Sequence, residues 1–447
     1  MRAPSSNQSV DVAIISAGAA GLAAARELHV SGYSVSILEA RHRVGGRVFT
    51  RRPHQSVLPI ELGAEFVHGR ADEVMQIATA ANLPVLEIEG TRVDSSGATL
   101  RPLNDFWERL DAVMRRLPDR RTTDLSFADF LKSRPGGPKL AANRRLARGF
   151  VEGFHAADIT RVSAASLREG GSPADDEREQ RLGRIVDGYD RVIDWLARPV
   201  LRRIRTGRPV HSIDWRDSRV VRVTTSDLML KARAAVVAVP VGVLQASLTR
   251  TGALRFDPPL DAKRTALTGL AMGCVTRIVL LFRDALWAEE RFASRTGIPF
   301  DLLTFLQGTS TDFPVWWTAY PSRVPLMTGW CGGPRAAALS GLPASELTRR
   351  AVRALALQLR VAPVRLERSL RAAWSHDWNR DPYARGAYSY TVVGGADATA
   401  ALARPLGGRL FFAGEATDTE GATGTVHGAI ASGRRAAQQV KRALGRH

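Results

Sequence analysis

Residues 11–25 read DVAIISAGAAGLAAA, and this stretch decides the fold. The apolar run Val10–Ile15 is typical of a strand buried on both faces, and the alanine-rich residues after it have the apolar spacing of a helix that ends at Gly32. A second apolar strand, residues 33–40, carries Glu39 near its end. Strand, glycine turn, helix, strand and acidic residue, in this order, predict a βαβ unit that binds a dinucleotide.

The glycine turn departs from the Gly-x-Gly-x-x-Gly pattern at its first position, where Ser16 stands. Gly18 lets the backbone approach a pyrophosphate and Gly21 lets the helix pack on the strand, and with Ala20 they form the predicted phosphate site. Because the first glycine serves the tight turn, we expect Ser16 to fit at some strain or with a shifted backbone. Glu39 follows Gly21 by eighteen positions, a spacing at which a carboxylate accepts hydrogen bonds from the adenosine ribose hydroxyls.

The next segment, residues 39–47, reads EARHRVGGR. It resembles the flavin fingerprint E-A-R-x-R-x-G-G-R of the flavin-containing amine oxidase superfamily, which includes monoamine oxidases, polyamine oxidases and lysine-specific histone demethylases. The resemblance implies FAD as the cofactor and assigns Ala40 to its site. Arg41 and Arg47 can offer fork-shaped donors to ribose and phosphate oxygens, and Gly46 permits close backbone approach.

Residues 61–69, ELGAEFVHG, resemble the family's segment beneath the flavin ring. Gly63 and Ala64 have side chains small enough to let the backbone lie against the isoalloxazine, and Glu65 is assigned to the same cofactor site. His68 falls where some polyamine oxidases place a histidine that faces the substrate amine. The resemblance therefore makes His68 a candidate catalytic residue.

Two later segments also resemble cofactor-binding parts of the family. In GRPVHSIDW, residues 207–215, Val210 falls where relatives bind adenine through backbone groups. In GRLFFAGEATD, residues 408–418, a strand is expected to deliver Gly414 and Glu415. The resemblance places Glu415 at the ribityl-phosphate region of the flavin.

Residues 425–444 have the apolar periodicity of a helix whose N-terminus holds Thr425 and Val426. Amide donors and the helix dipole there would stabilise the negative charge that develops on a reduced flavin. In WNRDPYARGAYSY the resemblance makes Tyr388 one wall of the cage around the substrate amine. Monoamine oxidases place a second tyrosine at the position of Thr425 and a flavin-bonding cysteine at that of Ala387, so we expect one aromatic wall and a non-covalent FAD.

Relatives place a lysine, which holds a water against flavin N5, in the strand that here contains Arg277. Arginine stays protonated and cannot act as a base, but it can donate to a water or to a substrate oxygen. Arg277 is therefore a third candidate catalytic residue. Lys263 is expected on the surface of a helix, where it would not replace the family lysine.

The formal net charge is +19, which by itself would attract polyanions. Only five of the 63 basic residues are lysine, the arginines are scattered along the chain, and no nucleic-acid-binding motif accompanies them. We therefore expect a solvated basic surface and no nucleic-acid partner.

Cys274 and Cys331 are the only cysteines, too few for a disulfide framework or a cysteine-based zinc site, and no metal site is expected. No window of about 18 apolar residues appears, so no membrane span is expected. The run 12–25 could imitate a signal peptide, but Gly18 and Gly21 interrupt it, and we expect a cytoplasmic protein.

The predicted fold class is α/β, with a Rossmann-like FAD-binding domain and a substrate-binding domain made of a mixed sheet and helices. Residues 1–72, 196–282 and 396–447 are assigned to the FAD-binding domain, and residues 73–195 and 283–395 to the substrate-binding domain. The block 73–195 resembles the family least, so the sequence gives little information about the identity of the substrate.

The resemblance implies an FAD-dependent amine oxidase that passes hydride from the α-carbon of an amine substrate to flavin N5 and reoxidises the flavin with O2, releasing hydrogen peroxide. One alternative is an L-amino-acid oxidase or a specialised biosynthetic dehydrogenase of the same fold, in which Arg277 meets a carboxylate or carbonyl. A second is a catalytically impaired flavoprotein with a binding role, marked by Ser16 and Arg277. The oligomeric state and the choice between O2 and another acceptor stay open.

Overall fold

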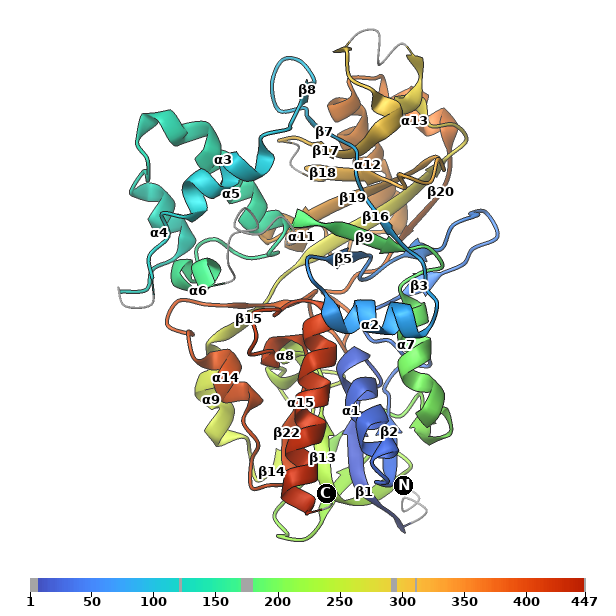
Figure 1. The fold of residues 1–447 in the computed structure, drawn as a ribbon, viewed down its shortest axis with the longest axis vertical. Helices are drawn as coiled ribbons and strands as arrows, with labels where there is room; N and C mark the ends of the chain where they lie inside the picture. Colours follow the sequence, from blue (N-terminus) through green and yellow to red (C-terminus); the bar gives the residue numbers. More distant parts are fainter. Residues whose placement is uncertain (1–6, 120–122, 170–179, 291–295, 310–311, 446–447) are drawn as a thin grey trace.

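The computed structural model describes residues 7–119, 123–169, 180–290, 296–309 and 312–445 (Figure 1). They form two stacked parts in the view of Figure 1, and both ends of the chain lie at the bottom of the lower part. The chain passes between the parts several times, so each part is assembled from segments that are distant in the sequence.

The lower part contains a sheet that we call the parallel sheet, whose order in the described chain is β10-β2-β1-β13-β12-β11-β14, with β22 paired to β13. Its parallel strands are β10 (Ile204–Arg205), β2 (Val35–Leu38), β1 (Asn7–Ile15), β13 (Met229–Val237) and β22 (Leu410–Phe412). It is extended by β12 (Val221–Thr224), β11 (Ser212–Asp214) and β14 (Arg255–Asp257). The carboxyl ends of β1, β2 and β13 meet at one edge, because Ile15 pairs with both Leu38 and Val237.

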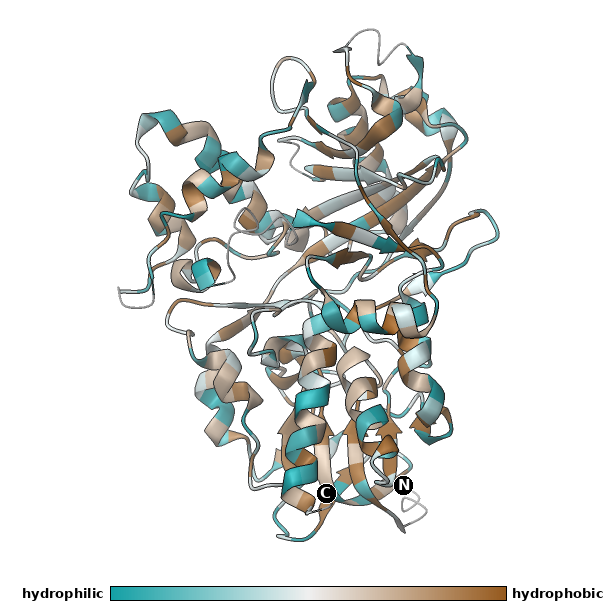
Figure 2. Ribbon diagram, viewed as in Figure 1, coloured by the Kyte–Doolittle hydropathy of each residue, from teal (hydrophilic) through white to brown (hydrophobic). Residues whose placement is uncertain are grey.

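Helices cover both faces of the parallel sheet, as the alternation along β1 shows. Val12 and Ile14 belong to one buried cluster with α1 (Ala19–Val30) and α15 (Val426–Leu444), and Ala13 and Ile15 belong to another. The first face also carries α7 (Asp190–Ala197), and the second carries α8 (Val241–Leu244), α9 (Arg264–Thr268) and α14 (Ala398–Ala403). Figure 2 shows hydrophilic and hydrophobic residues alternating along α15, as expected for a helix with one face on a sheet.

The predicted strand-helix-strand unit and the predicted C-terminal helix are confirmed, and both depend on glycine. A Cβ atom at Gly21 would lie 2.0 Å from the carbonyl oxygen of Ser16. Only glycine at this position therefore lets the first turn of α1 pack against the loop that precedes it. A Cβ atom at Gly433 would lie 2.2 Å from the carbonyl oxygen of Ala20, and α15 therefore crosses α1 at backbone contact.

The expectation for Lys263 is wrong. This residue ends a short 3-10 helix (Asp261–Lys263) and is buried, with 1% of its surface exposed. Its ammonium donates to the carbonyl oxygens of Ala401 and Arg404 and lies 4.8 Å from the ring centroid of Phe412. Lys263 therefore satisfies orphan carbonyls at the end of α14, a role that its sequence neighbours do not reveal.

The upper part contains the mixed sheet, whose order in the described chain is β20-β16-β19-β18-β17-β7-β8. Its strands are β20 (Leu370–Ser375), β16 (Val275–Phe282), β19 (Leu326–Gly332), β18 (Val315–Thr318), β17 (Leu303–Gln307), β7 (Thr91–Asp94) and β8 (Arg101–Pro102). Packed with it are α11 (Pro334–Leu339), α12 (Ala344–Leu359) and α13 (Pro363–Ser369). A helical lobe with its own core contains α3 (Phe106–Met114), α4 (Phe127–Lys132), α5 (Ala141–Gly153) and α6 (Ala164–Glu169).

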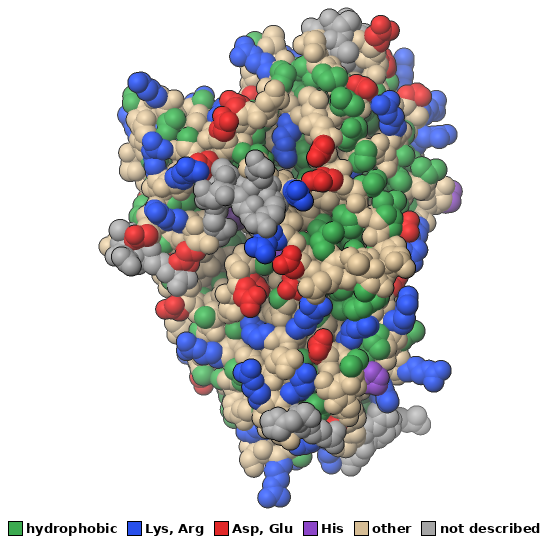
Figure 3. Space-filling view, in the orientation of Figure 1, with side chains coloured by type: hydrophobic (Ala, Val, Ile, Leu, Met, Phe, Trp, Pro, Cys, Tyr) green, Lys and Arg blue, Asp and Glu red, His purple; other side chains and the backbone are tan. Residues whose placement is uncertain are grey.

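Small elements join the two parts. They are the strand sets β5 (Phe66–His68), β9 (Leu182–Ile185) and β6 (Val85–Glu87); β15 (Leu270–Met272) and β21 (Ser389–Thr391); β3 (Thr50–Arg51) and β4 (Ile60–Glu61); and the helix α2 (Asp72–Ala80). Across the described residues, no helix combines the length and the apolar character needed to cross a membrane. On the face drawn in Figure 3, lysine and arginine side chains are dispersed among acidic and apolar ones.

Candidate functional site

A continuous cavity of about 1780 Å³ lies between the parallel sheet and the upper part of the molecule. Ordinary ligand pockets measure about 300–1,000 Å³, so this cavity has room for a large ligand and a second molecule. Its lining combines segments from both ends of the chain. The predicted cofactor and catalytic residues that line it are Ser16, Gly18, Ala20, Arg41, Gly46, Arg47, Gly63, Ala64, Glu65, His68, Arg277, Tyr388, Gly414, Glu415, Thr425 and Val426.

The remaining predicted cofactor residues do not line this cavity, as far as the described chain shows. Gly21 is buried within the first turn of α1, Glu39 and Val210 are buried, and Ala40 is partly exposed beside Glu39. Val210 packs into the core cluster on the second face of the parallel sheet. The structure thus brings the phosphate, ring and helix-terminus segments together, and the segment that precedes Val210 joins them, because the amides of Gly207 and Arg208 donate to the carbonyl oxygens of Arg41 and Glu39.

Ser16 makes the turn that a first glycine would make. Its φ angle is +95°, in the left-handed region that favours glycine, so the turn is kept at the cost of backbone strain. Its hydroxyl lies 3.3 Å from the Gly18 amide nitrogen, which donates to it, and 3.3 Å from Oε2 of Glu39, to which it donates. The serine hydroxyl therefore accepts from the Gly18 amide, a donor of the turn that a ligand in the cavity could otherwise use.

Gly18 and Gly46 bring two loops into contact at the cavity wall. Gly18 and Gly45 form an isolated parallel bridge, and Gly46 has a φ angle of +58°. A Cβ atom at Gly46 would lie 3.4 Å from the Cα atom of Gly18. Backbone atoms therefore form this wall, as an anionic ligand that binds main-chain amides requires.

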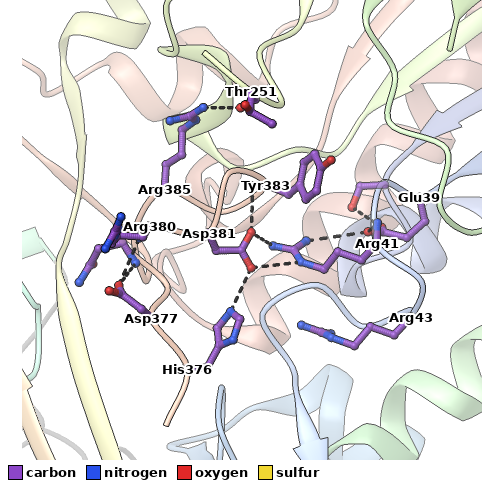
Figure 4. A network of polar contacts seen from close by, with 12 residues as sticks. Glu39, Arg41, Arg43, Thr251, His376, Asp377, Arg380, Asp381, Tyr383 and Arg385 are labelled. Carbon is purple, nitrogen blue, oxygen red and sulfur yellow. Dashed lines mark hydrogen bonds and ion pairs between the residues drawn. The ribbon is translucent and has the colours of Figure 1, made fainter. Parts of the chain in front are cut away.

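Glu39 and Arg41 belong to a polar network that closes one end of the site (Figure 4). Glu39 is 1% exposed and accepts hydrogen bonds from the amides of Ala17 and Arg41, at 2.8 and 2.9 Å. The Arg41 guanidinium donates to both oxygens of Asp381, at 2.7 and 3.3 Å, and His376 lies 3.0 Å from the same carboxylate.

Sequence reasoning missed Asp381 as a partner of Arg41. Burial would raise the pKa of Asp381, but the hydrogen bond with His376 and the charge of Arg41 lower it below its usual range. Asp381 lies in the segment WNRDPYARGAYSY, so the aspartate itself was visible. Nothing in that segment indicates that its partner lies 340 positions earlier.

Glu415 joins three cofactor-type segments. It is 4% exposed and accepts hydrogen bonds from Arg47 at 2.9 Å, the Ser389 hydroxyl at 2.7 Å and the Gly424 amide at 3.2 Å. Arg47 also donates to the carbonyl oxygen of Ala387 at 2.7 Å. Because so many donors converge on it, Glu415 fixes this wall of the cavity.

The helix α15 begins at the cavity. Thr425 is its N-cap, since the hydroxyl accepts from the Gly428 amide at 3.0 Å and donates to the Ala422 carbonyl oxygen at 2.7 Å. Thr425, Val426 and His427 all line the cavity, so the positive end of the helix dipole faces it.

A buried ionic cluster surrounds Arg277, which is 4% exposed. Its guanidinium donates to the Gly63 carbonyl oxygen at 2.8 Å and is in short contact with Glu65. Glu65 also accepts from Arg184 at 2.8 Å and from the Trp317 indole at 3.1 Å. Burial would raise the pKa of Glu65, but the charges of Arg277 and Arg184 lower it.

Two guanidiniums thus share one carboxylate, and the cluster keeps a net positive charge. The Nε atom of Arg277 is buried and has no hydrogen-bond partner in the described chain. A Cβ atom at Gly63 would lie 1.9 Å from the Arg47 carbonyl oxygen, so glycine is required where the Arg277 guanidinium meets the backbone.

His68 and Tyr388 meet at the aromatic side of the cavity. Burial, followed by the charge of His427, lowers the pKa of His68 to about 4, so its ring is neutral at neutral pH. The Tyr388 hydroxyl donates to the Phe154 carbonyl oxygen at 2.5 Å, and burial raises the pKa of Tyr388 above its usual range. The Phe154 ring lies 5.5 Å from that of His68, so both predicted residues border one apolar surface.

The model of the family described as flavin containing amine oxidoreductase matches residues 19–441 of this chain. Polyamine oxidase 2 of Arabidopsis thaliana is 28% identical over 471 residues, covering 97% of this chain and 88% of that protein. Lysine-specific histone demethylase 2 of Homo sapiens is 26% identical and covers 98% of this chain and 54% of that protein.

Two solved structures share the fold. Putrescine oxidase bound to putrescine has a TM-score of 0.81 at 21% identity, covering 98% of this chain and 100% of that one. Cyclohexylamine oxidase from Brevibacterium oxydans has a TM-score of 0.77 at 21% identity, covering 98% of this chain and 99% of that one.

Proposed function

Because this chain belongs to the flavin-containing amine oxidoreductase family, we propose that it oxidises the carbon–nitrogen bond of a small amine that binds beside Arg277. Members of this family are oxidoreductases that act on amines, and FAD is their cofactor. One observation carries the proposal: cofactor-type segments from both ends of the chain line a single cavity, which also has an aromatic side.

The residues present fit FAD. Backbone walls at Gly18 and Gly46, the dipole of α15 and the small residues Gly63 and Ala64 would hold the phosphates and the ring. Ala387 offers no thiol, so the cofactor is held without a covalent bond. When bound, FAD would supply the acceptor for the hydride that leaves the α-carbon as the amine becomes an imine, with O2 as the final acceptor, reduced to hydrogen peroxide.

Domain roles follow the same division in this proposal. Residues 1–72, 196–282 and 396–447 would hold FAD, and residues 73–195 and 283–395 would shape the substrate space, with the exception that β16 (Val275–Phe282) belongs to the mixed sheet and so to the substrate space. The mixed sheet, the helical lobe and their aromatic side chains support the second role, since they line the cavity away from the glycine turns.

The ionic cluster would set the protonation state of the substrate. Hydride leaves an amine most readily when the nitrogen keeps its lone pair, that is, in the neutral form. The net positive charge of Arg277, Arg184 and Glu65 disfavours a second cation nearby and so lowers the pKa of a bound amine. His68, neutral itself, adds no opposing charge.

Arg277 would act as a fixed charge and donor, because Glu65 and the Gly63 carbonyl oxygen hold its guanidinium in place. Tyr388 would form the aromatic wall beside the reacting carbon. Thr425 serves as a helix cap, so a second aromatic wall is not supplied from that position.

The first test is spectroscopic. We expect the purified protein to be yellow, to be bleached anaerobically by an amine, and to regain colour with hydrogen peroxide release when air is admitted. Primary amines, polyamines and L-amino acids are compared side by side. Folded protein that stays colourless with excess FAD, or that no amine bleaches, contradicts the proposal, and the second result favours an impaired flavoprotein.

A second candidate function is oxidation of an L-amino acid, or dehydrogenation of a biosynthetic intermediate that carries an acidic group. The observation that favours it is the surplus of guanidinium charge around Glu65. Activity confined to L-amino acids in the same screen would select this candidate.

A further inference from the structure

Aromatic rings line the part of the cavity away from the glycine turns, which we call the aromatic arm. The rings of Phe66, His68 and Phe154 follow one another at 5.8 and 5.5 Å between centroids, and Phe154 stacks on Phe150 at 4.9 Å. The arm's cavity-lining aromatic residues are Phe66, His68, Phe106, Trp107, Phe150, Phe154, Phe305 and Trp317. An apolar or aromatic ligand body fits such a lining.

Arg92, on β7, lies between the two ends of this lining. Its guanidinium carbon is 4.6 Å from the ring centroid of Phe305, 5.6 Å from that of Phe106 and 5.7 Å from that of Trp107. Arg92 itself lines the cavity. In the described chain its guanidinium has neither a hydrogen bond nor an ion pair, and burial lowers the pKa of Arg92 to about 10.

The absence of a carboxylate partner distinguishes Arg92 from the other deep guanidiniums of the cavity. Arg41, Arg47 and Arg277 are each paired with a carboxylate, as described above. A partly buried charge without a counterion is costly, and three rings recover only part of the lost hydration. A positive charge kept in this state beside a cavity is suited to an anion that arrives with a ligand.

Arg92 and Arg277 are connected through the same aromatic wall. Phe305 contacts Arg92, its ring centroid lies 6.2 Å from that of Trp317, and Trp317 lies 5.4 Å from the Arg277 guanidinium carbon. Two rings therefore separate the unpaired charge from the ionic cluster. A ligand whose amine lies at the ionic cluster can reach Arg92 with a second polar group only if a spacer separates that group from the amine.

We propose that Arg92 binds a carboxylate of the substrate, and that this carboxylate is separated from the reacting amine by a flat apolar spacer. This inference rests on the proposed function and specifies its substrate class as an aryl-spaced amino acid. A polyamine is disfavoured, because its distal ammonium would meet the Arg92 guanidinium. An α-amino acid is disfavoured too, because its carboxylate sits on the reacting carbon.

The test compares 4-(2-aminoethyl)benzoate with 2-phenylethylamine on the FAD-loaded protein. We expect kcat/KM for anaerobic flavin reduction to be about 10- to 100-fold higher for the carboxylated amine, the range expected for a hydrogen bond to a charged group. Arg92→Met should remove this preference, mainly through KM, and Arg92→Lys should restore part of it. Arg101→Met, an exposed cavity-rim arginine on β8, is the matched control and should keep the preference.

Binding of 4-ethylbenzoate, which has no amine, gives a readout that does not depend on turnover. We expect calorimetry to detect it with the wild-type FAD-loaded protein and the Arg101→Met variant, and not with Arg92→Met. Equal binding to Arg92→Met, or an unchanged preference in that variant, overturns the inference. If 4-ethylbenzoate binds through Arg92 but no amine of the spectroscopic screen bleaches the flavin, the proposed function fails while the anion site stands.

Discussion

In the half of the cavity that borders the glycine turns, which we call the cofactor half, the deep guanidiniums of Arg41, Arg47 and Arg277 are each paired with a carboxylate of this chain and the walls are backbone. In the aromatic arm, the walls are rings and Arg92 has no counterion in the described chain. In the first half the deep arginines have carboxylate partners, as suits a cofactor that stays bound. The second half leaves space beside Arg92, a guanidinium without a carboxylate partner in the described residues, as suits a ligand that comes and goes.

The largest effect is expected from comparing one glycine-to-alanine change in the cofactor half with one in the aromatic arm. Gly63→Ala would force a Cβ atom to within 1.9 Å of the Arg47 carbonyl oxygen, so we expect loss of FAD binding and of at least about 3 kcal/mol of stability. Gly149→Ala, in α5 and lining the arm, meets no atom within 4 Å and should stabilise by about 0.5–1 kcal/mol. Urea denaturation and retained flavin absorbance measure both. Equal tolerance of the two changes would contradict the contrast.

The second effect concerns the charges of the ionic cluster. Glu65→Gln leaves Arg277 and Arg184 buried without their shared anion, and we expect a loss of about 3–5 kcal/mol. Arg92→Met removes an unpaired charge and should cost little or even stabilise. Chemical denaturation of both variants, with Glu346→Gln as an exposed ion-pair control, measures the difference. A loss below about 1 kcal/mol for Glu65→Gln would show that the cluster does not hold this half together.

The third effect is a pH dependence of stability. The folded-state pKa of His68, about 4, lies below its ordinary value of 6.5, so the unfolded chain takes up the proton first as pH falls. The contribution of His68 leaves stability unaffected well above pH 6.5 and decreases it as pH falls from 6.5 to 4, by up to about 3 kcal/mol. His68→Gln should flatten that part of the profile, and so should His155→Gln in the arm, whose pKa burial also lowers to about 4. His54→Gln, at an exposed histidine, is the surface control.

The fourth effect tests the strain at the turn. Ser16→Gly relieves the +95° φ angle and should raise stability by about 1 kcal/mol and tighten FAD binding several-fold. Ser16→Ala keeps the strain and loses the hydroxyl, so it should do neither. Flavin release followed by fluorescence measures affinity. A weaker FAD complex for Ser16→Gly would mean that the serine hydroxyl contributes more than the strain costs.

The smallest effect is expected at Arg277, which stands where relatives have a lysine. Arg277→Lys keeps a cation beside Glu65, and we expect the rate of flavin reduction to be preserved or raised. Stopped-flow reduction with a substrate found in the amine screen measures it, with Arg277→Met as the variant that lacks the charge. A substantial loss in the lysine variant would show that the arginine has its own substrate contact.

The sequence was sufficient to predict the order of the cofactor segments, because each is a local pattern of glycines and apolar runs. Ser16 could be recognised as strained for the same reason. The pairing of Arg41 with Asp381 and the burial of Lys263 could not be predicted, since both depend on partners more than a hundred positions away. Arg92 carries no local signal either, because what sets it apart is a missing partner and three rings from other elements.

The backbone contact between α1 and α15, at Ala20 and Gly433, has a consequence for how the protein is made. The phosphate turn leaves the ribosome before the helix that seals it, which is synthesised more than 400 residues later. A nascent chain must therefore carry the alanine-rich face of α1 without its partner while the residues between α1 and α15 are synthesised. We expect ribosome-bound intermediates to depend on chaperones and to acquire the yellow cofactor only after α15 has emerged from the exit tunnel.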